Sequence, residues 1–145
     1  MTRKMKKTII MALCMGALSI SPIAVRGVDA AMTFTQNKDS YAEIAFDTLT
    51  IDLGTFSEKD PVQKCTFNFT NEGTAPLVIH QAFASCGCTV PKYTKTPIKP
   101  GCKGKIDVTY NGQGKFEGKF QKTITVRSNA KNNVVRLTIK GHMTK

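Results

Sequence analysis

Two cysteines separated by a single residue are the feature of this chain whose possible chemistry is most specific. Cys86 and Cys88 flank Gly87 in the segment Ser-Cys-Gly-Cys-Thr at 85–89. In an oxidising compartment, thiols this close form a structural disulfide, act as a redox pair, or bind a soft metal ion such as Cu(I) or Zn(II). The spacing permits all three roles, so it defines a candidate site without choosing its chemistry.

Further cysteines and one histidine extend the set of candidate residues. Cys65 and His80 are the candidates for a third metal ligand beside Cys86 and Cys88. The disulfide or redox candidates are Cys65, Cys86, Cys88 and Cys102, which allow three complete pairings that spacing alone does not distinguish. No cofactor is expected.

The expected topology adds a hypothesis about which cysteines can meet. In a two-sheet sandwich, the strands expected at 62–70 and 76–83 lie in different sheets and run in opposite directions. Cys65 then shares one end of the sandwich with the Cys-Gly-Cys segment, where a disulfide joining them would contribute about 2–4 kcal/mol. Cys102 is expected nearer the opposite end, too far for a disulfide with that segment, and it is the best candidate for an intermolecular one.

The N-terminal 30 residues have the pattern of a signal peptide. A basic start is followed by an apolar run at 8–20, and small residues precede a cleavage site after Ala30. The apolar run is shorter than the roughly 20 residues of a membrane-spanning helix, so we expect no stable transmembrane anchor. Cleavage would remove Cys14 and export the protein to the periplasm, the cell surface or the extracellular space.

Positive charge is concentrated in the second half of the chain. The formal net charge is +11, and residues 92–145 contain thirteen basic and two acidic side chains. These lysines are expected on solvated strand faces and turns, where they also protect sheet edges from unwanted pairing. No motif that combines basic and stacking aromatic residues is present, so nucleic acid is not an expected partner.

Hydrophobic alternation predicts an all-β fold. Short runs rich in Val, Ile, Thr and Phe end at Gly, Pro or Asn, which indicates about seven strands in an immunoglobulin-like antiparallel β-sandwich. The apolar run at 77–79 indicates a strand that is buried on both sides or lies near the middle of a sheet. The predicted organisation is a signal peptide at 1–30, an N-terminal segment or first strand at 31–48, one domain at 49–141 and a tail at 142–145.

Seven short segments occur in an order that resembles a known family: 51–55, 67–73, 76–79, 85–89, 98–101, 118–120 and 126–129. The chain resembles a secreted bacterial family of unknown function that is common in Bacteroidetes and related to Hydin-type and major-sperm-protein-type immunoglobulin-like domains. The resemblance covers residues 49–141. It implies an immunoglobulin-like sandwich and no established activity, and Cys65 and Cys102 are not part of its pattern.

Motifs for enzymatic catalysis are missing from the chain. It contains no nucleophile elbow, no zinc-protease helix and no glycine-rich phosphate loop, so we do not expect an enzyme. We expect an exported binding or structural module of the cell envelope that contacts a protein or glycan through its loops or a sheet edge. The alternative is a periplasmic thiol-redox or soft-metal protein centred on Cys86 and Cys88.

Overall fold

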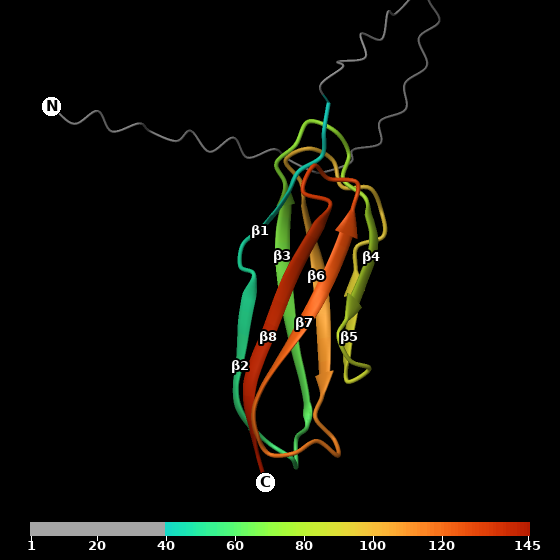
Figure 1. Ribbon diagram of the computed structural model, residues 1–145. Helices are drawn as coiled ribbons and strands as arrows, with labels where there is room; N and C mark the ends of the chain where they lie inside the picture. The colour runs from blue at the N-terminus through green and yellow to red at the C-terminus, as the bar shows by residue number, and fades with distance from the viewer. Residues whose placement is uncertain (1–39) are drawn as a thin grey trace, which may run out of the picture. The chain divides into compact units, whose positions relative to one another are not determined.

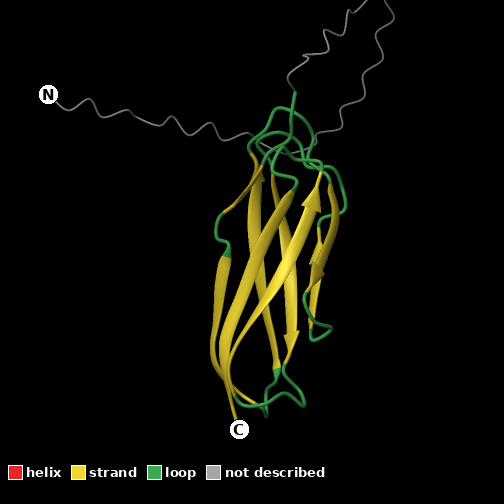
Figure 2. Ribbon diagram, in the orientation of Figure 1, coloured by secondary structure: helices red, strands yellow, loops and turns green. Residues whose placement is uncertain are grey.

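The computed structural model describes residues 40–145, which form two packed β-sheets (Figure 1). The predicted signal peptide and Cys14 lie outside the described residues. Within residues 40–145 every element is a strand and the connections are loops, as Figure 2 shows. Accordingly, the described part of the chain has no helix that is long and apolar enough to span a membrane.

Each sheet has four strands. The first has the spatial order β1 (Ile44–Phe46), β3 (Val62–Asn71), β6 (Lys103–Asn111) and β5 (Thr89–Tyr93). The second has the order β2 (Thr50–Ser57), β8 (Val134–Thr144), β7 (Gly118–Ser128) and β4 (Ile79–Ala84). Neighbouring strands are antiparallel, except that β2 runs parallel to β8. The predicted all-β immunoglobulin-like sandwich is confirmed.

The core lies between the sheets and follows the alternation of the sequence. On β3, Phe67 and Phe69 are fully buried, whereas the intervening Asn68 is exposed. The facing strand β8 buries Leu137 and Ile139 in the same alternating way. Successive side chains of a strand point to opposite faces, so every second residue packs inward and holds the two sheets together.

The structure differs from the prediction at β4 and at the C-terminal end of the domain. β4 is an edge strand rather than a central one, because only β7 pairs with it. It begins at Ile79 rather than at residue 76, because Leu77 forms an isolated bridge with Ile98 instead of pairing in the sheet. Residues 142–144 are not a tail: β8 continues through Thr144, and the Met143 side chain is buried in the core. With β1 counted separately, the sandwich has eight strands instead of about seven.

A cluster of aromatic rings closes the core at one end. Tyr110 of β6 stacks on Phe120 of β7 with ring centroids 4.2 Å apart, and Phe56 of β2 meets both rings edge-on. Burial raises the pKa of the Tyr110 phenol. Because each ring comes from a different strand, the cluster joins both sheets directly beneath the loops that leave this end.

Asn71 organises the opposite end of the sandwich. Its side chain is fully buried, and its Oδ1 accepts hydrogen bonds from the backbone N–H groups of Glu43 and Gly73. Its Nδ2 donates to the carbonyls of Ala75 and Ile98 at 2.8 and 2.9 Å. One amide therefore makes four hydrogen bonds to backbone groups from three segments.

Replacing this amide with a carboxyl group should destabilise the domain severely. Asn71→Asp replaces both Nδ2 donors with an oxygen that faces the carbonyls of Ala75 and Ile98, and it leaves the Ala75 carbonyl without a donor. We therefore expect a loss of more than about 3 kcal/mol in the free energy of unfolding. Asn68→Asp, at an exposed site on the same strand, should change it by less than about 0.5 kcal/mol. Urea unfolding followed by circular dichroism measures both, and equal effects would contradict the assigned role of Asn71.

Candidate functional site

The sulfur atoms of Cys86 and Cys88 are joined in a disulfide within the connection from β4 to β5. The two Cα atoms lie 5.3 Å apart. We call residues 85–89 the disulfide turn, because they carry the chain from one sheet to the other. Of the pairings left open by the sequence, the structure places the bond between the two closest cysteines, so the predicted staple from Cys65 is absent.

Backbone hydrogen bonds fix the disulfide turn on both sides. Ser85 N donates to Thr123 O in the second sheet, and Asn111 N donates to Cys88 O in the first. The Thr89 side chain is buried, and its hydroxyl lies 3.8 Å from each of the two sulfur atoms. The turn is therefore held by the framework as well as by the covalent bond.

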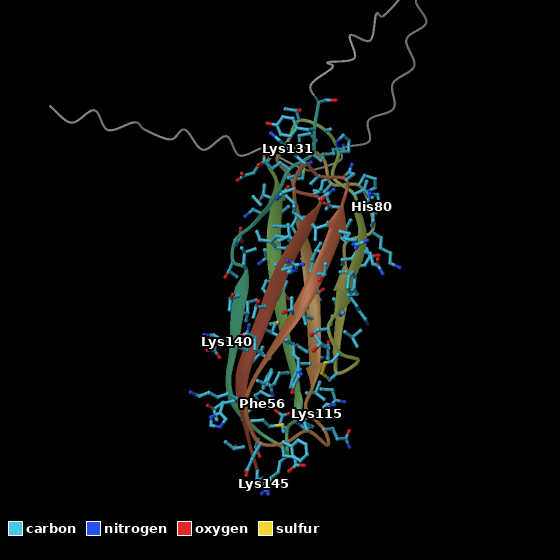
Figure 3. All side chains as sticks on the ribbon, in the orientation of Figure 1. Phe56, His80, Lys115, Lys131, Lys140 and Lys145 are labelled. Atoms are coloured by element: carbon cyan, nitrogen blue, oxygen red, sulfur yellow. A yellow bond between two sulfur atoms is a disulfide. The ribbon has the colours of Figure 1, made fainter. Side chains whose placement is uncertain are left out.

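The connection from β6 to β7, residues 112–117, lies beside this turn. Gly112 N donates to Pro61 O, Gln113 N donates to the Asn111 carboxamide oxygen, and Lys115 N donates to Gly112 O. The connections 58–61, 85–89 and 112–117 thus meet at one end of the sandwich, which we call the disulfide pole. The C-terminus and the labelled Lys115 side chain lie toward this end (Figures 1 and 3).

Phe116 is the most exposed large apolar residue of the described chain. It is 99% exposed, whereas the other exposed large apolar side chains range from 40% to 52%. Lys115 and Glu117 flank it, and the loop bends at Gly114 and Gly118, whose φ angles of 68° and 122° suit glycine. The loop therefore presents an aromatic ring to solvent with no intramolecular packing to account for its position.

A hollow of about 360 Å³ lies between the disulfide turn and the β6–β7 connection. Its walls come from the disulfide turn and the β6–β7 connection, through Gly87, Cys88, Asn111, Gln113 and Lys115. Cys88 and Lys115 thus share one open surface. The hollow offers hydrogen-bonding amides, one cation and a disulfide, with Phe116 following Lys115 in the chain.

A larger concavity, about 600 Å³, lies over β2, β8 and β7. Its central charges largely compensate each other, because Asp52 pairs with Lys140 at 3.5 Å. The Gly54 N–H, followed by Lys140, lowers the pKa of the Asp52 carboxyl. Lys119 and His142 also line it, and the surface is the solvated strand face that the sequence predicts.

Cys65 carries a free thiol on β3. It is half-buried against the core, and burial raises the pKa of its thiol above the ordinary value. A thiol with a raised pKa stays protonated at neutral pH and is a poor nucleophile. Cys65 lies opposite Val108 of β6, whereas the Cys88 carbonyl accepts a hydrogen bond from Asn111 N at the end of the same strand. Cys65 is therefore about 10 Å from Cys88 along the sheet.

The other candidate residues lie away from the disulfide. His80 is at the beginning of β4, roughly 20 Å of extended chain from Cys86; Figure 3 shows it near the end opposite Lys115. The Cys102 carbonyl accepts a hydrogen bond from Asn71 N, which places Cys102 at that same opposite end, as the topology predicts. Among residues 40–145, no three His, Cys, Asp or Glu side chains are grouped to bind a metal ion.

Phe116 is the feature of the site that the sequence analysis missed. Its signal was an aromatic residue between charged residues in a segment bounded by glycines, 112–118. A single apolar residue has no periodicity, so hydrophobic alternation gave no indication that this residue is exposed. For the Cys-Gly-Cys segment, the structure shows the Cys86–Cys88 disulfide, and a chemical role for it stays a prediction.

The comparison with protein families decides the classification. Residues 44–143 match the model of a family described as protein of unknown function, DUF1573. The chain belongs to the DUF1573 family. This membership agrees with the predicted resemblance to a family without an established activity, while the Bacteroidetes origin and the relation to Hydin-type and major-sperm-protein-type domains stay predictions. No curated protein matches the chain.

Solved structures similar to this DUF1573 domain share its fold at low sequence identity. A protein of unknown function from Porphyromonas gingivalis W83 matches with a TM-score of 0.62 at 16% identity, over 76% of this chain and 51% of that one. The ASH/PapD-like domain 7 of human CEP192 gives 0.58 at 11% identity, over 86% and 99%. The periplasmic chaperone SfaE gives 0.54 at 9% identity, over 70% and 58%. This chain therefore spans about half of the Porphyromonas protein, and the likenesses establish the fold alone.

Removing the disulfide should weaken the domain without unfolding it. The loop closed by Cys86 and Cys88 is very short, so the Cys86→Ser/Cys88→Ser double variant should lose about 1–2 kcal/mol of stability. Gly87→Ala is a matched control, because a Cβ at Gly87 has no atom within 4 Å. Urea unfolding of the three proteins tests this expectation, and a double variant as stable as the wild type would show that the bond adds nothing to the framework.

Proposed function

We propose that this DUF1573 domain is an exported protein-binding module of the cell envelope, and that it binds its partner through the disulfide pole. The observation that carries the proposal is the full exposure of Phe116 on a hydrogen-bonded loop. An aromatic side chain in water gains free energy when it enters a pocket on another protein. Aromatic anchors of this kind dominate the energetics of many protein interfaces.

The surroundings of Phe116 support a binding role over a chance exposure. The adjacent hollow presents the Gln113 side chain, the Lys115 cation and the disulfide turn, which together supply a polar rim beside an apolar anchor. The stacked rings of Tyr110 and Phe120 close the core below the loop. A surface that is ordered before binding loses less conformational entropy when it binds.

The fold comparisons are compatible with this role. SfaE is a periplasmic chaperone and the CEP192 segment is a PapD-like domain, so similar sandwiches occur in a periplasmic chaperone and in a domain of a human protein. The expected signal peptide places the module in the periplasm or at the cell surface. A protein of the envelope is the favoured partner, because an aromatic anchor suits an apolar protein pocket; a glycan is the alternative ligand.

A photo-crosslinking amino acid at position 116 tests the proposal in cells that make the protein. Placed at Phe116, it should form discrete crosslinked species with another envelope protein. Placed at Val134, which is 48% exposed at the start of β8, it should not form them. The same species at both positions, or none at 116, would contradict binding through the disulfide pole.

Competition with a variant separates binding from stability. Phe116→Ser should leave the free energy of unfolding within about 0.5 kcal/mol of wild type, because the ring has no intramolecular contacts to lose. It should compete for the crosslinked partner at least tenfold more weakly, as expected for an interface hot spot. Equal competition by the variant would remove Phe116 from the interface.

Thiol–disulfide exchange is a second candidate function, favoured by the position of the disulfide on an open hollow with Lys115. The co-reactant would be a dithiol protein. One of its thiolates attacks a sulfur of the Cys86–Cys88 bond and forms a mixed disulfide; its second thiol then releases the mixed bond. The products are two thiols on this chain and one disulfide on the partner, and Lys115 would stabilise the thiolate that leaves.

Equilibration with glutathione buffers distinguishes this candidate from a structural disulfide. Trypsin leaves Cys65, Cys86 and Cys88 on one peptide, 65–92, where alkylation reports the reduced fraction. A functional pair should titrate in the folded protein, and Lys115→Ala should raise the oxidised-to-reduced ratio about twofold. Lys131→Ala, which removes a cation placed over the Tyr41 ring, is the control. A pair that stays oxidised, or identical effects of the two variants, would exclude the exchange role.

A further inference from the structure

Each sheet has two edge strands, and three of the four edges carry features that hinder pairing with another chain. β1 has three residues, and β5 contains Pro91 and Lys92. β2 has an irregular register between Asp52 and Thr55 and a charged side chain at Asp52. Short length, proline, charge and irregularity are the usual means by which natural sheets protect their edges.

The fourth edge, β4, lacks these protections over its second half. Its sequence, Ile-His-Gln-Ala-Phe-Ala, contains no proline, lysine, arginine, aspartate or glutamate. Its one irregularity lies between Ile79 and Gln81, so Ala82, Phe83 and Ala84 continue the regular ladder. Phe83 is 40% exposed and Ala82 and Ala84 are half-buried, which leaves an apolar, uncharged strip at the side of the molecule where Figure 1 labels β4.

The hydrogen bonds at the end of β4 show which backbone groups face outward. Ser85 lies opposite Thr123 in the continued register and donates to its carbonyl. Hydrogen-bonded and non-hydrogen-bonded pairs alternate in an antiparallel ladder, so Phe83 directs its backbone toward β7, and Ala82 and Ala84 direct theirs away from it. His80 follows the outward phase, and its carbonyl accepts a hydrogen bond from the Tyr93 hydroxyl at 3.1 Å. The next outward-facing residues along the edge are therefore Ala82 and Ala84.

We propose that β4 pairs with β4 of a second copy of this chain, in an antiparallel register that places Phe83 opposite its own copy. Ala82 of each protomer then faces Ala84 of the other, and each pair exchanges both N–H···O bonds. The two Phe83 rings form a non-hydrogen-bonded cross-strand pair, the closest kind in an antiparallel ladder. The result is one sheet that continues through both protomers.

Charge favours this edge for contact between identical copies. The second half of the chain is strongly basic, with thirteen basic and two acidic residues at 92–145, so contacts between two copies through this half bring like charges together. Self-pairing of β4 puts no lysine or arginine of the strand against its equivalent. The strip is small, so we expect a weak dimer with a dissociation constant on the order of 10–100 µM.

Sedimentation velocity over a concentration series tests the dimer with a matched pair of variants. Phe83→Lys places like charges at the closest cross-strand pair and should weaken dimerisation at least tenfold. Val90→Lys adds the same charge at a residue 52% exposed on the β5 edge and should dimerise as the wild type does. A wild-type protein that is monomeric up to about 1 mM, or a Phe83→Lys variant that dimerises normally, overturns the proposal.

A cysteine substitution tests the register directly. In the proposed pairing the two Cα atoms at position 83 lie about 4.5 Å apart, within the range that a disulfide spans. Phe83→Cys should form a covalent dimer under mild oxidation, whereas Val90→Cys should not. Absence of the covalent dimer, or equal crosslinking of the two variants, contradicts this register, and both variants must show the wild-type circular dichroism spectrum.

Discussion

The stacking of Tyr110 on Phe120, with Phe56 against both, is the contact on which the disulfide pole depends. The three rings come from β6, β7 and β2, and the 112–117 and 58–61 connections begin next to them. Burial of three aromatic side chains at one point closes the core where it would otherwise open to water. The loop that carries the exposed Phe116 is thereby attached to the aromatic cluster on both sides, through Tyr110 and Phe120.

Hydrogen bonds and one covalent bond extend this order to the surface. The disulfide turn makes one backbone hydrogen bond to each sheet, and Gly112 N donates a hydrogen bond to Pro61 O across the pole. At the opposite end, the buried amide of Asn71 holds three segments together through its hydrogen bonds. Both ends of the sandwich are therefore ordered without a helix in the described chain, and the end that exposes an aromatic ring beside polar groups is the one suited to binding.

The sequence predicted the sandwich because alternation on β3, β6 and β8 reports directly on which face is buried. It misplaced β4, since the apolar run at 77–79 is equally compatible with a central strand and with Leu77 turning into the core beside Ile98. It left the cysteine pairing open, because connectivity depends on distances that topology alone does not provide. Phe116 and the edge position of β4 depend on exposure, which a single-sequence pattern does not report.

The order of the 112–117 connection is the property to measure first, because the account requires Phe116 to be presented by a loop that is already structured. Backbone ¹⁵N relaxation of the free domain gives an order parameter for each residue of this connection. The account predicts order parameters above about 0.8 at residues 112–115, close to those of the adjoining strands. Values below about 0.6 over the whole connection would mean that the loop is flexible on the ps–ns timescale and would contradict a preformed binding surface at the disulfide pole.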